Sequence, residues 1–386
     1  MATQAGSVIY LALDLSRSGW VAAVLLPGAQ RPSRYKLEAG QCDGLLRLIA
    51  RAKAIAENRI EGTVRVCSCY EAGYEGFWLH RVLTAAGVDS HVVDPSSLQV
   101  NRRARRAKSD GIDVEMLLRA LIGWQRGEKD RASVVRVPTP EIEDDRRISR
   151  ERDRLVREQT RHVNRIKGLL ASEGIFGFEP RLAGAAERLA GLVTGDGRPL
   201  PPHLCEALRR EFVRLGLVAE QIGTVERVRD ARRPRGRSRK DAARPAPAPE
   251  STPGRVAALK KLRGIGPEIA SVLAREVFCR DFRNRRQLGS YCGLDPSPFG
   301  SGDTYREQGI SKAGNARARH VLTEAAWLWL EHQPESALAR WWRERVGAAK
   351  GRVRRLMIVA LARKLVIALW RYLKTGSPPQ GALLAA

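Results

Sequence analysis

The sequence has no long apolar run. No stretch reaches the roughly 18 apolar residues of a membrane-spanning helix, and the most apolar one, residues 356–370, is interrupted by Arg363 and Lys364. Residues 1–4 include no basic segment ahead of the first apolar one. We therefore expect no secretory signal, no membrane partner and a cytoplasmic location.

The cysteines lack the spacing of a metal or disulfide framework. The chain has six, at positions 42, 67, 69, 205, 279 and 292. They form no CxxC pair, and no histidine cluster lies beside them in the sequence. Zinc sites and disulfide scaffolds usually show such spacing. We interpret the six as free thiols of a reducing compartment and expect neither zinc nor disulfides.

Acidic residues are scarce relative to basic ones. The 386 residues include 42 Asp and Glu against 68 Lys and Arg, a formal net charge of +26. Such a surplus repels itself unless a polyanion meets it, and nucleic acid is the commonest one. The basic residues recur along the whole chain, which favours nucleic acid over an anionic membrane surface. At 43% hydrophobic residues, the chain is apolar and long enough for two or three packed units.

The first half of the chain divides into two predicted parts. Residues 1–130 alternate short apolar strands with helical patterns, which predicts an α/β domain. In residues 140–228, Val156, Val163 and Leu170 repeat every seven residues, and Leu208, Leu215 and Ile222 do the same. This spacing predicts two long helices with coiled-coil seams. The seams are equally consistent with an antiparallel hairpin in one subunit and with a contact between subunits.

The second half begins with a segment that could not fill a core. Residues 229–254 are rich in Arg, Pro and Ala, which predicts a flexible basic linker. Residues 255–375 are expected to form a compact, mostly helical unit, and residues 376–386 a tail. Within that unit, Gly264 and Gly266 have the spacing of a helix-hairpin-helix, whose free backbone N–H groups bind a DNA phosphate. The alternative is a simple turn between two helices.

Four acidic residues predict a metal site. Asp14 and Glu71 each end a predicted strand, whereas Asp110 and Asp113 share one face of a predicted helix start. Strand ends of an open α/β sheet converge on a crevice where ligands bind, and four oxygen ligands there suit Mg²⁺. Two such ions about 4 Å apart assist phosphodiester chemistry. Taken singly, each acid is also consistent with an unremarkable strand-edge charge or, for Asp110, a helix N-cap.

Further candidate residues flank these acids or lie far along the chain. A basic run precedes the acid pair: Arg102, Arg103, Arg105, Arg106 and Lys108. Beside a metal site this run could hold a phosphate backbone, although it could also be a solvated face. Ser301 lies between two glycines in a Pro- and Gly-rich loop, where its hydroxyl would be little shielded. A serine so placed can attack phosphate if a base or metal activates it, but composition alone supports this weakly.

Together these motifs resemble one family. The four acids, followed by GIGPEIASVLARE, SYCGLDPSPFGSG and QGISKAGNARARHVLTEAAWLWL, resemble the DEDD transposases of bacterial insertion sequences 110 and 1111. The segments GISKAGN, AWLWL and QPESALARWWRERV look more like the 1111 branch. The resemblance extends from about residue 8 to residue 373.

The resemblance implies a fold and a mechanism. The N-terminal domain would be RuvC-like, of the RNase H type, with Mg²⁺ held by Asp14, Glu71, Asp110 and Asp113. The C-terminal domain would bring Ser301 to the same composite site, where it forms a phosphoserine link to DNA. A structured bridge or seeker RNA would pair with donor and target DNA. The protein would act in bacterial cytoplasm on the nucleoid, as dimers that assemble into tetramers through an intermolecular coiled coil.

The sequence departs from the family in two places. Arg17 stands where we expect Lys more often, and the linker is longer and more basic than expected. Lys312, Arg317 and Arg319 are further candidates to hold phosphate.

Two other functions remain open. A RuvC-type endonuclease would use the acids and water and need no serine. A non-catalytic nucleic-acid-binding protein would need neither the acids nor the serine. Substitution of Ser301 separates the first of these from a recombinase, and substitution of Asp14 separates both enzymes from the binder.

Overall fold

The computed structural model describes residues 7–60, 62–98, 110–231, 248, 250–301 and 304–385. For residues 110–112, 231, 298–301 and 304–308 it describes the backbone alone. The chain divides into two units, Met1–Pro138 and Thr139–Ala386. Among the described residues, no helix has the length and apolar character to cross a membrane.

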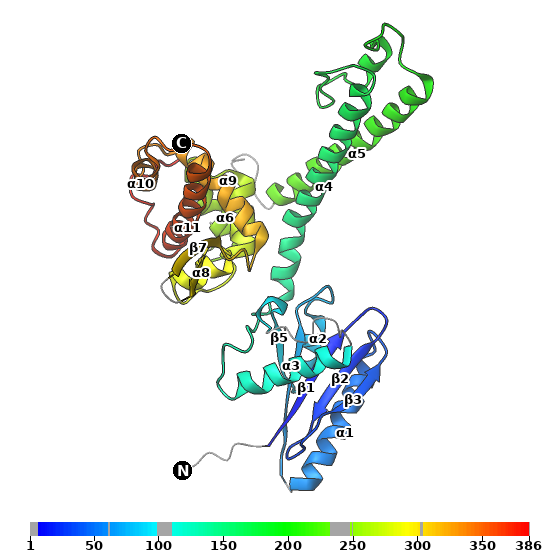
Figure 1. The fold of residues 1–386 in the computed structure, drawn as a ribbon, viewed down its shortest axis with the longest axis vertical. Coiled ribbons are helices and arrows are strands. Elements are labelled where there is room, and N and C mark those ends of the chain that lie inside the picture. The colour runs from blue at the N-terminus through cyan, green and yellow to red at the C-terminus, as the bar shows by residue number, and fades with distance from the viewer. Residues whose placement is uncertain are drawn as a thin grey trace, which may run out of the picture. The chain divides into compact units, whose positions relative to one another are not determined.

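The first unit is built on a five-stranded mixed sheet in the order β3-β2-β1-β4-β5 (Figure 1). The strands are β1 (Val8–Leu15), β2 (Trp20–Leu25), β3 (Ser33–Leu37), β4 (Arg65–Glu71) and β5 (Asp89–Val93). The first three pair antiparallel, whereas β1, β4 and β5 are parallel. The helices are α1 (Cys42–Ile60), α2 (Trp78–Ala85) and α3 (Asp110–Gln125). The α/β class predicted for this part of the chain is confirmed.

Alternation along β1 and β4 assigns each side chain to one face of the sheet. Leu11 and Leu13 pack in a core that includes Leu45 of α1 and Leu79 of α2. Residues of the opposite parity, including Ala12, Cys67 and Cys69, pack under Val114, Leu117, Leu118 and Leu121 of α3. We call this second side the α3 face. Its small side chains let the helix lie close to the sheet.

The second unit begins with two long helices, α4 (Pro140–Ala171) and α5 (Pro202–Ala231). The side chain of Thr139 caps α4 by accepting a hydrogen bond from Ile142 N, and Pro140 occupies the first turn. The two helices pack along each other (Figure 1). The seam residues Val163, Leu170, Leu208 and Leu215 are buried in one core between them. This part of the seam therefore closes within one chain.

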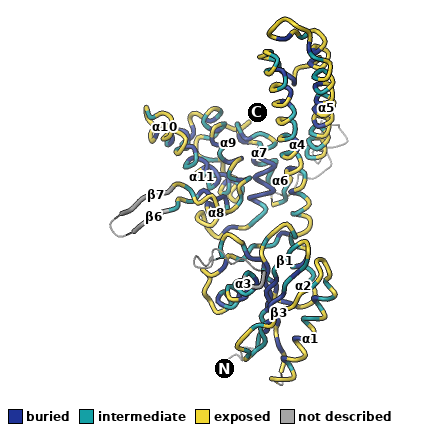
Figure 2. The backbone as a smooth tube through the Cα atoms, turned by 45° about the vertical axis from the view of Figure 1, so that its right-hand side comes forward, coloured by how far each residue is buried: buried dark blue, intermediate teal, exposed yellow. Residues whose placement is uncertain are grey.

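The remainder of the second unit is mostly helical, as expected. Its helices are α6 (Thr252–Lys260), α7 (Pro267–Val272), α8 (Arg285–Tyr291), α9 (Ala316–His332), α10 (Ala337–Val346) and α11 (Arg352–Thr375). A π-helical segment, Leu273–Val277, continues α7, and residues 269–277 of the two are buried (Figure 2). The core gathers Leu322 and Trp329 of α9 with Leu361 and Leu365 of α11.

One part of this unit differs from the sequence prediction. Strands β6 (Pro296–Ser301) and β7 (Thr304–Ile310) form an antiparallel hairpin where we expected an irregular loop. The Pro and Gly residues there signal turns, and they obscured the alternation on which recognition of a strand depends.

Candidate functional site

Asp14 and Glu71 lie at the carboxyl ends of neighbouring parallel strands. The register pairs Leu13 of β1 with Tyr70 of β4, so each acid comes one residue after this pair. Asp14 has the parity of Ala12 and Glu71 that of Cys69, and both of these residues pack on the α3 face. The alternation of the strands therefore directs both carboxylates to the same face, at the same edge.

Helix α3 brings the other two acids to that face. The helix begins at Asp110, and Asp113 lies one turn further, immediately before the buried Val114. The backbone of Asp110 is described, whereas its side chain is not. Because Val114 and Leu117 anchor α3 over the sheet, the first turn of the helix is held to the same face as Asp14 and Glu71.

The carboxylates are not drawn tightly together. In the described part of the chain, Asp14, Glu71 and Asp113 do not form a group whose ligand atoms lie within 4.8 Å of one another. Asp14 and Asp113 are partly exposed and Glu71 is exposed. Like charges repel at short range, so a loose arrangement is expected of three carboxylates. The donors are all carboxylate oxygens, which fits a hard divalent ion.

The predicted nucleophile belongs to the second unit. Ser301 is the last residue of β6 and pairs with Thr304 of β7. Its backbone is described and its side chain is not. The serine therefore lies on a strand at the hairpin end.

Comparisons with known proteins agree along the chain. A model of the DEDD transposases of IS110 elements, described as "Transposase", matches residues 11–174. A second, described as "Transposase IS116/IS110/IS902 family", matches residues 256–341. The Sinorhizobium fredii protein named "Putative transposase y4rJ" is 47% identical over 382 residues, which cover 97% of this chain and 94% of that protein.

Two further relatives are transposases named for insertion sequence elements. The transposase for IS1328 of Yersinia enterocolitica is 30% identical over 241 residues, covering 61% of this chain and 63% of that protein. The transposase for IS1111A of Coxiella burnetii is 27% identical over 274 residues, covering 69% and 66%. The chain belongs to the IS110 family of transposases. The family predicted from the motifs is thereby confirmed.

The residues predicted to bind phosphate in this transposase differ from one another in exposure and in contacts. The basic run, Arg102, Arg103, Arg105, Arg106 and Lys108, falls outside the described residues. Lys312 is exposed and has a φ of 57°, the left-handed region that few non-glycine residues adopt.

The two arginines at the start of α9 contact the protein itself. Arg317 donates to Ser149 O of α4 at 2.5 Å. Arg319 donates to Cys292 O and Ala313 O, each at 3.4 Å. These hydrogen bonds hold α9 to α4, to the end of α8 and to the loop before α9. Phosphate binding by either arginine stays a prediction.

Gly264, the first glycine of the turn between α6 and α7, packs closely against α9. Gly264 has a φ of 86°, and a Cβ there would lie 3.0 Å from His332 Cβ and 3.2 Å from Leu328 O of α9. Only glycine fits such a position without strain. Gly266 caps α7 ahead of Pro267, and nothing lies near the place of its missing Cβ. The helix-hairpin-helix contact with DNA stays a prediction, and of the two glycines Gly266 has the open position.

Sequence reasoning missed a buried carboxylate in the second unit. Glu276 has 1% of its side chain exposed and accepts hydrogen bonds from Arg150 Nε at 2.7 Å and Nη2 at 3.0 Å. Asn315, the cap of α9, donates to it at 3.2 Å. Burial alone would raise the pKa of Glu276, but hydrogen bonds and charge from Arg150, with charge from Arg146, hold that pKa below its usual value. A charged residue within the apolar run of GIGPEIASVLARE was the available signal.

Sequence reasoning also missed a cluster in the first unit. Cys67, Asp89 and His91 have ligand atoms within 4.8 Å of one another. No histidine cluster lies beside the cysteines in the sequence, and on that ground we expected no zinc; Cys67 and His91 are far apart along the chain. The available signal was alternation: Asp89 and His91 are two apart on one strand, and Cys67 and Cys69 are two apart on its neighbour.

Proposed function

We propose that this transposase cuts and rejoins donor and target DNA with Mg²⁺ at Asp14, Glu71, Asp110 and Asp113 and with Ser301 as nucleophile. The observation that carries the proposal is the placement of Asp14 and Glu71 at the ends of adjacent parallel strands, on the face covered by the start of α3. The fold proposed for this unit is the RuvC-like, RNase H type fold that the resemblance implies.

In the proposed reaction, the Ser301 hydroxyl attacks a backbone phosphorus. The serine–phosphate ester forms as a phosphate–deoxyribose ester breaks, the serine gives up its proton and the departing sugar oxygen gains one. A hydroxyl of the partner strand then attacks the phosphoserine and releases the serine. The bound ions would supply charge stabilisation for the attacking and leaving oxygens. Because each step exchanges one ester for another, strands are rejoined without an external energy source.

We further propose that a bridge or seeker RNA guides the protein and that subunits assemble through α5. The net charge of +26 suits a protein that holds two DNA duplexes and an RNA together. Helix α5 exposes Val213, Leu217 and Val228, at 73%, 54% and 52%. Exposed apolar residues along one helix favour an intermolecular coiled coil, leading from dimers to tetramers.

Ser301→Ala tests the nucleophile, with Ser297→Ala in the same hairpin as matched control. The proposal predicts that Ser301→Ala abolishes cleavage and covalent protein–DNA adducts on nicked substrate, whereas Ser297→Ala retains both. Cleavage retained in Ser301→Ala would instead identify a RuvC-type endonuclease that uses water.

Sequencing of copurified nucleic acid tests the guide. RNA guidance predicts one discrete species, encoded beside the gene. Heterogeneous fragments would contradict guidance and leave the nuclease chemistry unaffected.

A further inference from the structure

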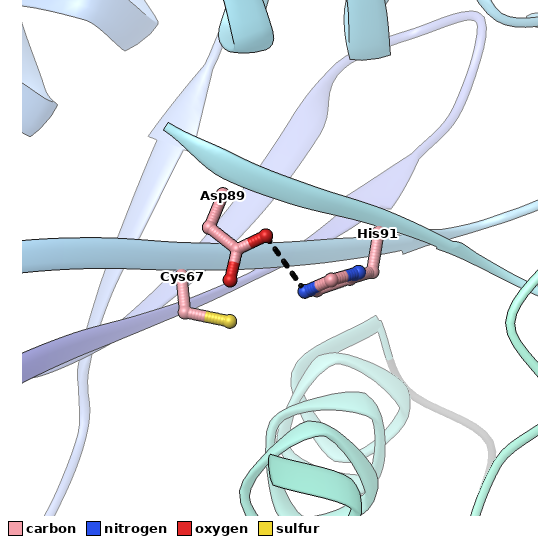
Figure 3. Close-up of side chains that lie close together, drawn as sticks. All are labelled: Cys67, Asp89 and His91. Atoms are coloured by element: carbon pink, nitrogen blue, oxygen red, sulfur yellow. Dashed lines mark ion pairs between the residues drawn. The ribbon is translucent and has the colours of Figure 1, made fainter. Parts of the chain in front are cut away.

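The α3 face carries a second cluster of metal-ligating side chains, away from the acids. Cys67 lies on β4, four residues before Glu71, which corresponds to about 13 Å of strand. Asp89 and His91 lie on β5, and the register pairs Cys67 with Asp89. Gln125, the last residue of α3, contacts all three side chains from the helix that covers this face of the sheet. Figure 3 shows the thiol, the carboxylate and the imidazole turned toward one another.

Hydrogen bonds alone do not satisfy this cluster. Gln125 Nε2 lies 3.0 Å from Cys67 Sγ, 3.4 Å from Asp89 Oδ2 and 3.2 Å from His91 Nε2, but an amide nitrogen has only two hydrogens. His91 Nε2 is also 3.1 Å from Asp89 Oδ1, an ion pair that requires a proton on Nε2. A protonated Nε2 cannot accept from the amide, so two donors face each other.

Turning over the Gln125 amide ends the conflict with His91, but it places the amide oxygen beside Asp89 Oδ2, so that two acceptors then face each other. A cation among these atoms satisfies both oxygens. We propose that Cys67, Asp89 and His91 bind one zinc ion, with Oε1 of Gln125 as the fourth ligand. The two ends of an amide are assigned from their surroundings, and turning over the Gln125 amide directs its oxygen to the ion. Zinc takes thiolate, imidazole and carboxylate ligands in a tetrahedron, at about 2.0–2.3 Å. Tetrahedral geometry places such ligand atoms about 3.3–3.7 Å apart, so the present separations need only small side-chain movements.

The surroundings distinguish this site from a magnesium site. Cys67 is 2% exposed, whereas 48% of the Asp89 side chain is exposed, so an ion can enter from the side of the carboxylate. Burial raises the pKa of the Cys67 thiol to about 12, and a bound zinc ion displaces that proton. Magnesium prefers oxygen ligands and keeps its waters. The ring of Trp124, centred 4.8 Å from that of His91, helps to hold the imidazole.

The ion has a structural consequence. It connects the edge strand β5 to β4 and to the end of α3. The opposite ends of β4 and α3 carry Glu71 and Asp113, so the zinc would brace the framework that positions the acids without touching DNA.

Metal counting on the full-length protein tests the site. The protein is stripped with a chelator, reloaded with zinc alone, and its bound metal is measured. The wild type should retain one equivalent more than Cys67→Ala. The matched control is Cys69→Ala, on the same strand and face, whose thiol contacts Leu117 O at 3.6 Å and should leave the count unchanged. Asp14→Asn should also leave it unchanged, which separates this zinc from any ion at the acids.

Cobalt alone provides a second readout. Reloading with cobalt should give a near-ultraviolet thiolate-to-metal band and intense visible bands of tetrahedral cobalt in the wild type and in Cys69→Ala. Both should be lost in Cys67→Ala, and His91→Ala should weaken them if Cys67→Ala does not fold. The proposal is overturned if the wild type retains no zinc. It is also overturned if the zinc equivalent and the cobalt spectrum persist in both Cys67→Ala and His91→Ala.

Discussion

The two ends of the α3 face differ in chemistry although the same sheet and helix build them. At one end, Asp14, Glu71 and Asp113 offer carboxylate oxygens only, and they stand partly or fully exposed. At the other end, Cys67, Asp89 and His91 offer sulfur, oxygen and nitrogen beside a buried thiol. The first set suits a hard ion that must reach a substrate, and the second suits an ion that stays in place. A single strand, β4, contributes to both through its alternation.

The largest expected effect comes from the acid end. Asp14→Asn removes a charged metal ligand, so we expect DNA cleavage to fall by at least about a hundredfold. The fall should be measured on nicked and intact DNA at fixed magnesium and salt. Asp43→Asn, an exposed acid in the first turn of α1, serves as control. Unchanged cleavage in Asp14→Asn would remove this end of the face from the chemistry.

The sequence patterns predicted a site at one end of the α3 face and none at the other, for a physical reason. Asp14 and Glu71 follow apolar strands, and the edge where parallel strands end is a general binding place. The Cys67 cluster depends on which residue of β4 faces which residue of β5, and a register is not visible in a single strand. The α/β class, the two long helices and the helical C-terminal unit followed from periodicity. The β6–β7 hairpin did not, because its prolines and glycines conceal the alternation.

The second-largest effect is expected at Glu276, a carboxylate that is neutralised by arginines of the protein and not by a metal ion. Glu276 is paired with Arg150 and lies near Arg146, so it should stabilise the fold and bind no metal. Glu276→Gln leaves the buried Arg146 and the half-exposed Arg150 without their anion, and we expect a loss of about 1–3 kcal/mol in the free energy of unfolding. Denaturant unfolding of the full chain measures it, against Glu324→Gln, an exposed acid of α9.

The same residue has a pH signature with a definite sign. Its pKa is lower in the folded protein than in the unfolded chain, so its stabilising contribution is complete above the unfolded value. The contribution is lost as the pH falls through the lower folded value. Wild type and Glu276→Gln should therefore converge in stability on acidification. A difference that stays constant down to the folded pKa and below it would contradict the assigned ion pairing.

Zinc should act on stability at the other end of the α3 face. At a free zinc concentration of about 100 times the dissociation constant, a bound ion stabilises the folded state by about 2.7 kcal/mol. Scanning calorimetry should show a corresponding rise in the melting temperature of the wild type and of Asp14→Asn, and none in Cys67→Ala. Magnesium at the same concentration should not produce this rise in the melting temperature of any of the three proteins. A zinc effect that depends on Asp14 would mean that the two ends are one site.

The smallest expected effect concerns the fourth ligand. Gln125→Ala leaves Cys67, Asp89 and His91 in place and lets water take the remaining position, so zinc affinity should fall by about tenfold rather than vanish. Gln125→Glu should retain the affinity, since a carboxylate oxygen is a good zinc ligand. Competition with a chromophoric chelator measures all three proteins. Equal zinc affinity in the wild type and in Gln125→Ala would mean that water is the fourth ligand. A lower zinc affinity in Gln125→Ala alone would mean that the ion connects α3 to the sheet. In that case zinc fixes the C-terminal end of α3, the helix that begins with Asp110 and Asp113. The zinc site then helps to hold those two acids in place for the ion that the acids bind.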